Sequence, residues 1–434
     1  MMIEATEIQR HIRQLAVGIG VRLAGSAGEQ RAVDYIVDQF KAAGVSARTE
    51  TFPIMQRDVA SQSLKIHAGG VWKAFPCSLF SNTPGTDGRE VEAPLAVHDA
   101  HGENDRMDLS HLTGKAVLHL GSHIESAAQY QRLIAAKPAC MLFVDVRYPG
   151  TTALADGMFP EYRRRMGAVP TLNVAYQDAW SWIVAKADRA RFCVKGGMKP
   201  ATSTNVIAEI AGAGGAGAGD DGPVIFLSAH HDTQADSPGA DDNASGVSAL
   251  LAAAPVIRGM GLGCTVRLIS FGAEEQLSVG SEQYVRAHRA ELAQRGGVVI
   301  NLDSIGSAMG WFELFLLGTE PMQKLAISRA QARGIWARAS SAAMPYADHF
   351  PFAAAGVSGM TLLRPNCAAG RFFHHRPDDD MTRVDPAIIA NCATWAAEMA
   401  QALAPWTKPQ LVPTPDPQTQ AAIATYWKDL FGGW

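Results

Sequence analysis

Residues 224–246 constrain the fold of this chain more than any other stretch. They open with an apolar run suited to a buried β-strand and end at Ser245 and Gly246, where a helix-forming segment begins. The titratable side chains between these two ends are His230, His231, Asp232, Asp236, Asp241 and Asp242. Carboxylates crowded at the end of a buried strand cost free energy unless a cation neutralises them, and zinc prefers such nitrogen and oxygen donors. We therefore expect a metal site at the end of this strand.

The same pattern recurs later in the chain. Residues 266–271 lead into Glu274 and Glu275, residues 298–302 lead into Asp303, and residues 360–363 lie between Asp348-His349 and Arg364, with His374 and His375 beyond. A single acidic residue after a strand is more often a helix cap than a ligand. The carboxyl ends of parallel strands, however, share one edge of a sheet, so these donors would meet there. Helix capping alone does not readily explain why titratable residues follow so many strands.

The order of strands and helices predicts the fold class. From residue 205 to residue 403, apolar strand-like runs alternate with segments of helical periodicity, which favours an α/β fold. We expect a mixed, largely parallel central sheet with helices on both faces. A strand is expected at residues 48–54, a single helix at residues 281–294, and a short helix within residues 421–434 that packs on its own chain.

The pattern of predicted elements changes near residue 58, where short strands and turn-rich segments begin. We predict a main domain formed by residues 1–57 and 199–405. Residues 58–198 would be an inserted, smaller α/β or β-rich domain, and residues 406–434 a proline-rich tail with a short helix. At about 140 residues the insertion has the size of a typical domain. The alternative is that residues 58–198 simply continue one large α/β domain.

Charge and hydropathy exclude several classes of function. The net charge is −4 and no basic stripe is present, so nothing favours a nucleic-acid partner. No apolar run approaches the ~18 residues of a membrane span, and the N-terminal segment lacks the apolar region of a secretory signal. The six cysteines are scattered without a Cys-x-x-Cys pair, which favours reduced thiols in a cytoplasmic protein. A homodimer is compatible with the sequence, which leaves the oligomeric state open.

The adjacent Glu274 and Glu275 fit two different tasks in a two-metal site. Two metal ions ~3.5–4 Å apart share a bridging carboxylate and need further ligands of their own. One glutamate of the pair can bind a metal while its neighbour accepts a proton from the attacking water. The inventory of donors therefore favours hydrolysis assisted by two metal ions.

Taken in order, seven motifs resemble those of the M28 family of zinc-dependent peptidases, which includes bacterial aminopeptidases and the plasma glutamate carboxypeptidase group. The motifs are Arg-Leu-Ala-Gly-Ser at 22–26, His-x-Asp at 230–232, Gly-Ala-Asp-Asp-Asn-Ala-Ser-Gly at 239–246, Glu-Glu at 274–275, Asn-Leu-Asp-Ser-Ile-Gly at 301–306, Asp-His-x-Pro-Phe at 348–352 and His-His-Arg-Pro-Asp-Asp-Asp at 374–380. The resemblance covers most of the chain. It implies the zinc exopeptidase fold, and the insertion resembles the protease-associated domain of many members.

The resemblance also implies a role for each site residue. The implied metal ligands are His230, Asp242, Glu275, Asp303 and His375, which would hold two Zn²⁺ ions, or other divalent ions such as Co²⁺ or Mn²⁺. Glu274 would be the general base. Asp232 would orient the His230 imidazole without binding the metal itself, and Asp379 would be paired with His375. The neighbouring His231 and His374 would face elsewhere. The implied activity is cleavage of a peptide or amide bond at a chain terminus, in a small peptide or an N-acyl amino acid.

The chain departs from the family pattern around His375. The family usually has Thr after this His and Asp-Thr at the end of the motif, where this chain has Arg376 and Asp379-Asp380. Arg364, Arg371 and Arg376 could therefore hold a substrate carboxylate, with Asp348 and His349 as further candidates for substrate binding. Alternatively, the arginines pair with the carboxylates of residues 378–380.

Two other functions belong to the same fold. One is a glutaminyl-cyclase-like acyltransferase with a single zinc ion. The other is a binding protein without catalysis, although members of that kind lose ligands and this chain retains the whole set.

Overall fold

The computed structural model describes residues 2–100, 107–121, 124, 126–152, 154–213, 222–367 and 372–434. The chain divides into two compact units. Unit 1 comprises Met1–Ile54, Thr202–Phe373 and Pro377–Trp434, and unit 2 comprises Met55–Ala201 and His374–Arg376. The helix of the C-terminal tail is part of unit 1, and the short segment 374–376 is grouped with unit 2.

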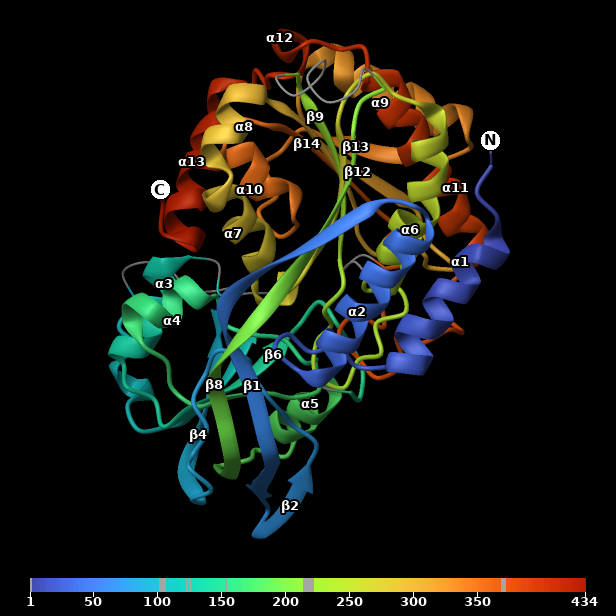
Figure 1. The fold of residues 1–434 in the computed structure, drawn as a ribbon. Coiled ribbons are helices and arrows are strands. Elements are labelled where there is room, and N and C mark those ends of the chain that lie inside the picture. Colours follow the sequence, from blue (N-terminus) through green and yellow to red (C-terminus); the bar gives the residue numbers. More distant parts are fainter. Residues whose placement is uncertain are drawn as a thin grey trace. The chain divides into compact units, whose positions relative to one another are not determined.

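The sheet of unit 1 is mixed, with a parallel centre (Figure 1). Its strands, in spatial order, are β13 (Ala337–Ser340), β12 (Phe312–Leu317), β14 (Ser358–Leu363), β11 (Gly297–Leu302), β9 (Val224–His230), β10 (Val266–Phe271) and the C-terminal part of β8 (Arg189–Ile210). Strands β14, β11, β9 and β10 run parallel to their neighbours in this row. Strands β12 and β8 pair antiparallel at either side of it. The long strand β1 (Ser46–Ala68) pairs with β8.

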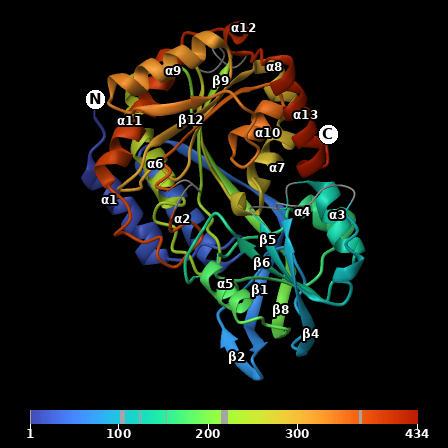
Figure 2. The same cartoon turned by 180° about the vertical axis from the view of Figure 1, so that it is seen from behind.

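Helices cover both faces of this sheet. They are α1 (Ala5–Ile12), α2 (Ala27–Ala42), α6 (Ala244–Met260), α7 (Val279–Ala287), α8 (Arg289–Arg295), α9 (Glu320–Ala332), α10 (His349–Ala354), α11 (Pro386–Leu403), α12 (Lys408–Leu411) and α13 (Pro417–Phe431). Figures 1 and 2 show α1, α6 and α11 on one side of the sheet and α7, α8, α10 and α13 on the other. The predicted fold class is confirmed, both by this arrangement and by the solved structures described below.

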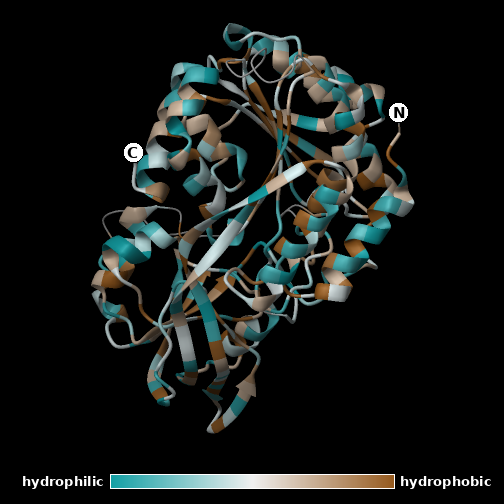
Figure 3. Ribbon diagram, in the orientation of Figure 1, coloured by the Kyte–Doolittle hydropathy of each residue, from teal (hydrophilic) through white to brown (hydrophobic). Residues whose placement is uncertain are grey.

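Strand β9 contributes to two separate hydrophobic cores. Ile225, Leu227 and Ala229 belong to the core under α6 and α11, whereas Val224 and Phe226 belong to the core under α7 and α10. Because successive side chains of a strand point to opposite faces, a strand covered on both faces has to be apolar throughout. Figure 3 accordingly shows the central strands as mainly hydrophobic, whereas hydrophilic and hydrophobic stretches alternate on the helices.

Unit 2 is a smaller α/β unit with its own core. Its strands are β2 (Val71–Phe75), β3 (Ser78–Leu79), β4 (Val91–Asp99), β5 (Ala116–Gly121), β6 (Cys140–Asp145) and β7 (Thr171–Asn173), and its helices are the short 3-10 helix Ser110–Leu112, α3 (Ala127–Ala135), α4 (Pro160–Met166) and α5 (Tyr176–Val184). Strands β4, β5, β6 and β7 are parallel in that order. Leu118, Leu142 and Trp182 are buried together. The similarity of this unit to a protease-associated domain stays a prediction.

Several local predictions were wrong in extent. The strand expected at residues 48–54 is part of β1, a 23-residue strand that continues to Ala68 and buries Leu64 and Ile66 in the core of unit 2. The helix expected at residues 281–294 is two helices, because His288 leaves the helical conformation between α7 and α8. The C-terminal helix α13 begins earlier than expected, at Pro417. As predicted, it packs on its own chain: the rings of Phe350 in α10 and Phe431 in α13 are stacked 5.6 Å apart.

No helix in the described part of the chain combines the length and the apolar composition of a membrane span.

Candidate metal centre

The strand register brings three groups of predicted site residues to one edge of the unit 1 sheet. His230, the last residue of β9, is paired with Phe271 at the end of β10, and Asn301 near the end of β11 is paired with Ser228. The glutamate pair follows β10 and Asp303 follows β11, so both start their turns beside His230. Parallel strands that end at the same level produce this convergence.

His230 lies at the centre of a group of carboxylates. Its Nε2 is 3.2 Å from Asp242 Oδ1, 3.6 Å from Asp303 Oδ1 and 3.9 Å from Glu274 Oε2. The potential ligand atoms of His230, Asp242 and Asp303 all lie within 4.8 Å of one another, and all three residues are buried. His230 Nε2 makes no hydrogen bond in the described structure. One nitrogen and several oxygen donors converging in a buried space form a donor set suited to zinc.

Burial and charge act strongly on this group. Burial alone would lower the pKa of His230, but the Glu274 charge and the carboxylates of Asp232, Asp242 and Asp303 outweigh it and raise that pKa well above its usual value. Burial also raises the pKa of Glu274, and the charge of His230 opposes this effect. Buried groups with strongly shifted pKa values and specific partners are characteristic of functional sites.

The loop that joins β9 to α6 is fixed by hydrogen bonds near Asp242. Both carboxylate oxygens of Asp379 accept backbone N–H groups, from Asp241 at 2.8 Å and from Asp242 at 3.0 Å. Asn243 caps α6 by accepting from Gly246 N, and its Nδ2 donates to Leu302 O. Asn243 therefore ties the Asp242 loop to the end of β11, next to Asp303.

The turn that carries the glutamate pair is fixed by Asp232. The Asp232 carboxylate accepts from Glu274 N at 3.0 Å and from Glu275 N at 3.3 Å. Asp232 Oδ1 is also 3.5 Å from His230 Nδ1, which contacts the Asp232 backbone oxygen at 3.2 Å. The Ser278 hydroxyl donates to Glu274 Oε1 at 3.2 Å. Asp232 thus supports both His230 and the turn of the glutamate pair, which is more than the sequence predicted for it.

His231 and His230 have different partners. The ring of His231 contacts Ser270 Oγ at 2.9 Å through Nδ1, and its Nε2 lies 3.8 Å from Glu29 Oε1. Burial lowers the pKa of His231 to about 4. His231 thus occupies a buried polar network beside β10, whereas His230 faces the carboxylate group.

His375, a further predicted metal ligand, lies in the segment His374–Arg376, which belongs to unit 2. There the rings of His374 and His375 are stacked at 3.3 Å, and His374 also stacks on Tyr148 at 5.5 Å. Ala155 N donates to His375 O at 3.2 Å, and Arg376 Nη2 donates to Tyr148 O at 3.3 Å. The role of His375 as a metal ligand, and that of Glu275, stay predictions from the motifs.

The predicted substrate-binding residues that the structure describes each have partners of their own. Asp348 is fully buried and accepts from Ser281 Oγ at 2.6 Å, and burial raises its pKa to about 7. His349 is fully buried against Thr361 Oγ1 at 2.7 Å. Arg364 donates to Ser307 O at 2.8 Å and lies over the Phe312 ring. Arg371 lies outside the described residues. Asp378, proposed as a partner of these arginines, instead pairs with Arg383 at 2.9 Å.

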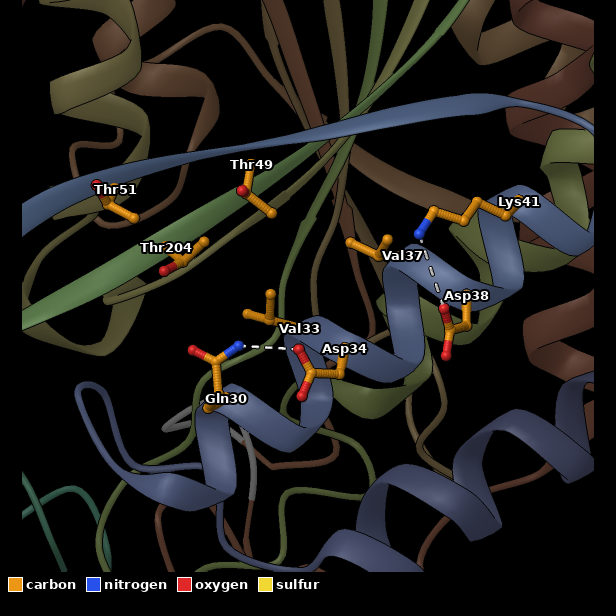
Figure 4. Close-up of a pocket in the computed structure, with 9 residues that line it drawn as sticks. All are labelled: Gln30, Val33, Asp34, Val37, Asp38, Lys41, Thr49, Thr51 and Thr204. Atoms are coloured by element: carbon orange, nitrogen blue, oxygen red, sulfur yellow. Dashed lines mark hydrogen bonds and ion pairs between the residues drawn. The ribbon is translucent and has the colours of Figure 1, made fainter.

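A separate cavity of about 560 Å³ lies along α2, away from this group in the sequence (Figure 4). It is lined by Gln30, Val33, Asp34, Val37, Asp38, Lys41, Thr49, Thr51 and Thr204, which include none of the predicted metal ligands. Gln30 donates to Asp34 at 2.9 Å, and Lys41 lies 4.0 Å from Asp38. The hollow is therefore not part of the metal centre.

Sequence reasoning missed the hydrogen bonds by which three residues support the turns of the site. Ser278, Asn243 and Asp379 each hold a turn of the site through hydrogen bonds. For Asn243 a signal was available, because Asn directly before a helix is a favoured N-cap. Acceptors of backbone N–H groups from distant segments, such as Asp379, leave no comparable pattern.

Comparisons with known proteins agree with this geometry. Residues 205–400 match the family described as Peptidase family M28. The chain is 27% identical over 175 residues to aminopeptidase YwaD of Bacillus subtilis, a match that covers 37% of this chain and 37% of that protein. It is 27% identical over 286 residues to bovine carboxypeptidase Q, covering 63% and 59%. The chain thus spans less than two thirds of these curated relatives.

Solved structures share the fold over nearly the whole chain. The aminopeptidase from Aneurinibacillus sp. strain AM-1 superposes with a TM-score of 0.71 at 23% identity, covering 95% of this chain and 97% of the other. A structure described as a peptidase M28 precursor from Shewanella amazonensis gives 0.75 at 20% identity, covering 94% and 97%. Residues 205–400 therefore resemble peptidase family M28 in sequence, and the chain shares its fold with these solved structures.

Proposed function

We propose that this protein is a dinuclear zinc exopeptidase that hydrolyses a peptide or amide bond at a chain terminus. One observation supports this proposal above all others. Carboxylate oxygens of Asp242, Asp303 and Glu274 lie 3.2, 3.6 and 3.9 Å from the same nitrogen, Nε2 of His230. The family match and the names of its relatives, an aminopeptidase and a carboxypeptidase, agree with it.

The donor set fits zinc. His230, Asp242 and Asp303 would hold one ion, and the motifs predict Glu275 and His375 as ligands of a second. The buried His230 nitrogen without a hydrogen bond, surrounded by carboxylate oxygens, supports the first of these sites. When bound, the ions would lower the pKa of a water molecule and polarise the scissile carbonyl.

The protein itself would supply the proton transfers. Glu274, held by the hydroxyl of Ser278, would take a proton from the attacking water and later give it to the leaving amine. Asp232 would keep Glu274 in place through its backbone N–H and would orient the His230 ring. Buried Asp348 and His349 would line the substrate side of the same edge, which follows from the motif.

Metal analysis combined with a substrate panel tests the proposal. The purified protein, dialysed against metal-free buffer, is expected to retain two zinc ions per chain by mass spectrometry. A panel of amino-acid p-nitroanilides and N-acyl amino acids then identifies which terminus is recognised. One zinc ion per chain with cyclisation of N-terminal Gln would favour the glutaminyl-cyclase-like alternative. Metal binding without hydrolysis of any substrate would favour a non-catalytic member.

A further inference from the structure

Arg22 is a fully buried arginine whose side chain donates only to backbone carbonyls among its described hydrogen bonds. The acceptors are His231 O at 2.7 Å, Pro238 O at 2.7 Å, Gly239 O at 3.0 Å, Gly20 O at 3.0 Å and Leu15 O at 3.1 Å. Burying a guanidinium is costly unless its donors are satisfied. Five carbonyl oxygens accept from its three nitrogens, and no carboxylate is among the acceptors that the structure describes.

Three of these carbonyls belong to one functional loop. His231 follows the metal-ligand candidate His230 directly, and Gly239 lies three residues before Asp242. The guanidinium therefore joins the two ends of the loop that connects these candidates. A backbone contact reinforces the connection, because Arg22 N donates to Thr233 Oγ1 at 3.0 Å.

The loop is shaped to accept this side chain. Gly239 has a φ of +57°, and a Cβ there would lie 3.0 Å from Arg22 Nη2 and 2.2 Å from Asp242 O. Only glycine allows both the backbone conformation and this close approach. Gly239 is thus fitted to Arg22 on one side and to Asp242 on the other.

The charge of Arg22 is complementary to the site. Burial lowers the pKa of Arg22 to about 10, and the charges of Asp379, Asp232, Asp242 and Glu275 oppose that effect. The guanidinium is therefore still cationic at neutral pH. A fixed cation behind a group of carboxylates reduces their mutual repulsion without competing for their metal-facing oxygens.

We propose that Arg22 is a positioning residue of the metal centre: it fixes both ends of the loop between His230 and Asp242 and so sets the geometry and the affinity of the zinc site. This inference rests on the proposed function, because it requires that His230 and Asp242 bind zinc. The Arg22 side chain itself touches neither the metal nor the substrate.

The test is Arg22→Lys, which keeps the charge but loses the planar fork. Arg295→Lys is the matched control: Arg295 is also buried and donates to Gly222 O at 2.9 Å and to Thr265 Oγ1 at 3.0 Å, near the opposite ends of β9 and β10. Zinc affinity is measured by competition with a chromophoric chelator, and site geometry by the visible spectrum of the Co²⁺-substituted protein. Since partners that support ligands typically change affinity by about 10–100-fold, we expect zinc to bind at least ~10-fold more weakly to Arg22→Lys.

The control separates this role from general stability. Arg295→Lys is expected to lower the melting temperature of the metal-free protein while leaving zinc affinity and the Co²⁺ spectrum unchanged. Zinc affinity of Arg22→Lys within twofold of that of the wild type would overturn the inference. If Arg22→Lys does not fold, Thr233→Val decides, because it removes only the hydroxyl that accepts from Arg22 N. An affinity loss of a few fold supports the inference, and an unchanged affinity rejects it.

The same measurements keep this inference separate from the proposed function. Absence of zinc binding by the wild-type protein would reject the proposed function. Zinc binding by the wild type that is insensitive to the deciding variant, Arg22→Lys or, where that does not fold, Thr233→Val, would reject only the role of Arg22.

Discussion

Two turns at the same edge of the sheet hold the site in different ways. The turn after β9, which carries Asp242, is fastened by hydrogen bonds from distant segments, with Asp379 accepting two of its N–H groups and Arg22 donating to three of its carbonyls. The turn after β10, which carries Glu274, contains three non-glycine residues with positive φ: Ala273 at 53°, Leu277 at 74° and Ser278 at 50°. Left-handed backbone costs of the order of 1 kcal/mol per such residue.

This difference suggests a division of tasks. Ligands must keep fixed separations around an ion, and a network of hydrogen bonds and charge from outside the loop provides that. A general base must present one carboxylate at a defined angle, and here the dihedral angles of a tight turn add to the two hydrogen bonds that the Asp232 carboxylate accepts from that turn. Changes in the first turn should therefore affect metal binding, and changes next to Glu274 in the second turn, which leave the predicted ligand Glu275 in place, should affect turnover.

The largest expected effect is that of Glu274→Gln. The amide cannot accept the proton of the attacking water, and general-base catalysis contributes about 10²–10⁴-fold, so kcat should fall by about that factor. Zinc content should stay at the wild-type level, because the backbone N–H of residue 274 still donates to Asp232. The measurement is steady-state kinetics together with metal analysis of the same preparation.

Glu282→Gln is the matched control for that variant. Glu282 lies in α7, in the same part of the chain, and pairs with Arg286 at 2.8 Å. It should keep near-normal kcat. A Glu274→Gln protein as active as Glu282→Gln would show that another group accepts the proton.

The next largest effect is expected in the other turn. Asp379→Ala removes the carboxylate that accepts from Asp241 N and Asp242 N, so Asp242 loses its fixed position. We expect zinc affinity to fall by about 10–100-fold, the usual range for a partner that supports a ligand. Asp378→Ala is the control, because Asp378 is half-exposed and pairs with Arg383. Equal affinity of the two variants in chelator competition would contradict this assignment.

The fate of Asp379 illustrates what a sequence can reveal about such a site. His230, Glu274 and Asp303 were predictable, because each follows an apolar run, and parallel strands bring such ends together. The pairing of Asp379 with His375 comes from the motif and stays a prediction, whereas the acceptance of the N–H groups of residues 241 and 242 by its carboxylate was not predicted. Backbone acceptors and donors of this kind depend on the folded path of the loop, and no spacing of side chains encodes them.

Arg22 is a donor whose hydrogen-bond partners the sequence did not reveal either. The Arg-Leu-Ala-Gly-Ser segment was recognised as part of the family resemblance, but its five carbonyl acceptors lie on three separate stretches of chain. The fold class followed from the alternation of apolar strands and helices, because burial on both faces imposes that pattern. The length of β1 did not follow in this way, because mostly polar residues between Ile54 and Leu64 interrupt the apolar alternation before it resumes at the buried Leu64 and Ile66.

A smaller effect concerns Glu29, which supports the loop that contains Arg22. Glu29 accepts from Ser203 Oγ and from Gly25 N, and burial, together with the charge of Asp232, raises its pKa to about 8. The folded state therefore holds this proton between pH 4.5, the ordinary value, and about pH 8, whereas the unfolded state loses it. The stability that comes from this group is complete below pH 4.5 and is lost as the pH rises through 8.

Glu29→Gln should remove that dependence, because the amide is neutral throughout. Chemical denaturation of the metal-free protein at several pH values between 5 and 8 measures the free energy of unfolding of both proteins. The wild type should lose stability relative to Glu29→Gln as the pH rises, with a slope of at most ~1.4 kcal/mol per pH unit. A constant difference between the two proteins across this range would show that Glu29 is ionised in the folded state.

The smallest expected change in stability tests the strained turn itself. Ala273→Gly relieves the strain of the left-handed conformation, which stabilises the folded state by about 1 kcal/mol. It also removes one buried methyl group, which destabilises the folded state by about 0.8 kcal/mol. The free energy of unfolding should therefore barely change. Glycine nevertheless frees the backbone just before Glu274, so kcat should fall severalfold with zinc affinity unchanged. Lys186→Gly is the control: Lys186 is exposed in unit 2 with a φ of 53°, and its replacement should stabilise without altering kcat. If Ala273→Gly leaves kcat unchanged, the unusual dihedral angles of the turn do not position the base, and the contrast between the two turns reduces to their hydrogen bonds.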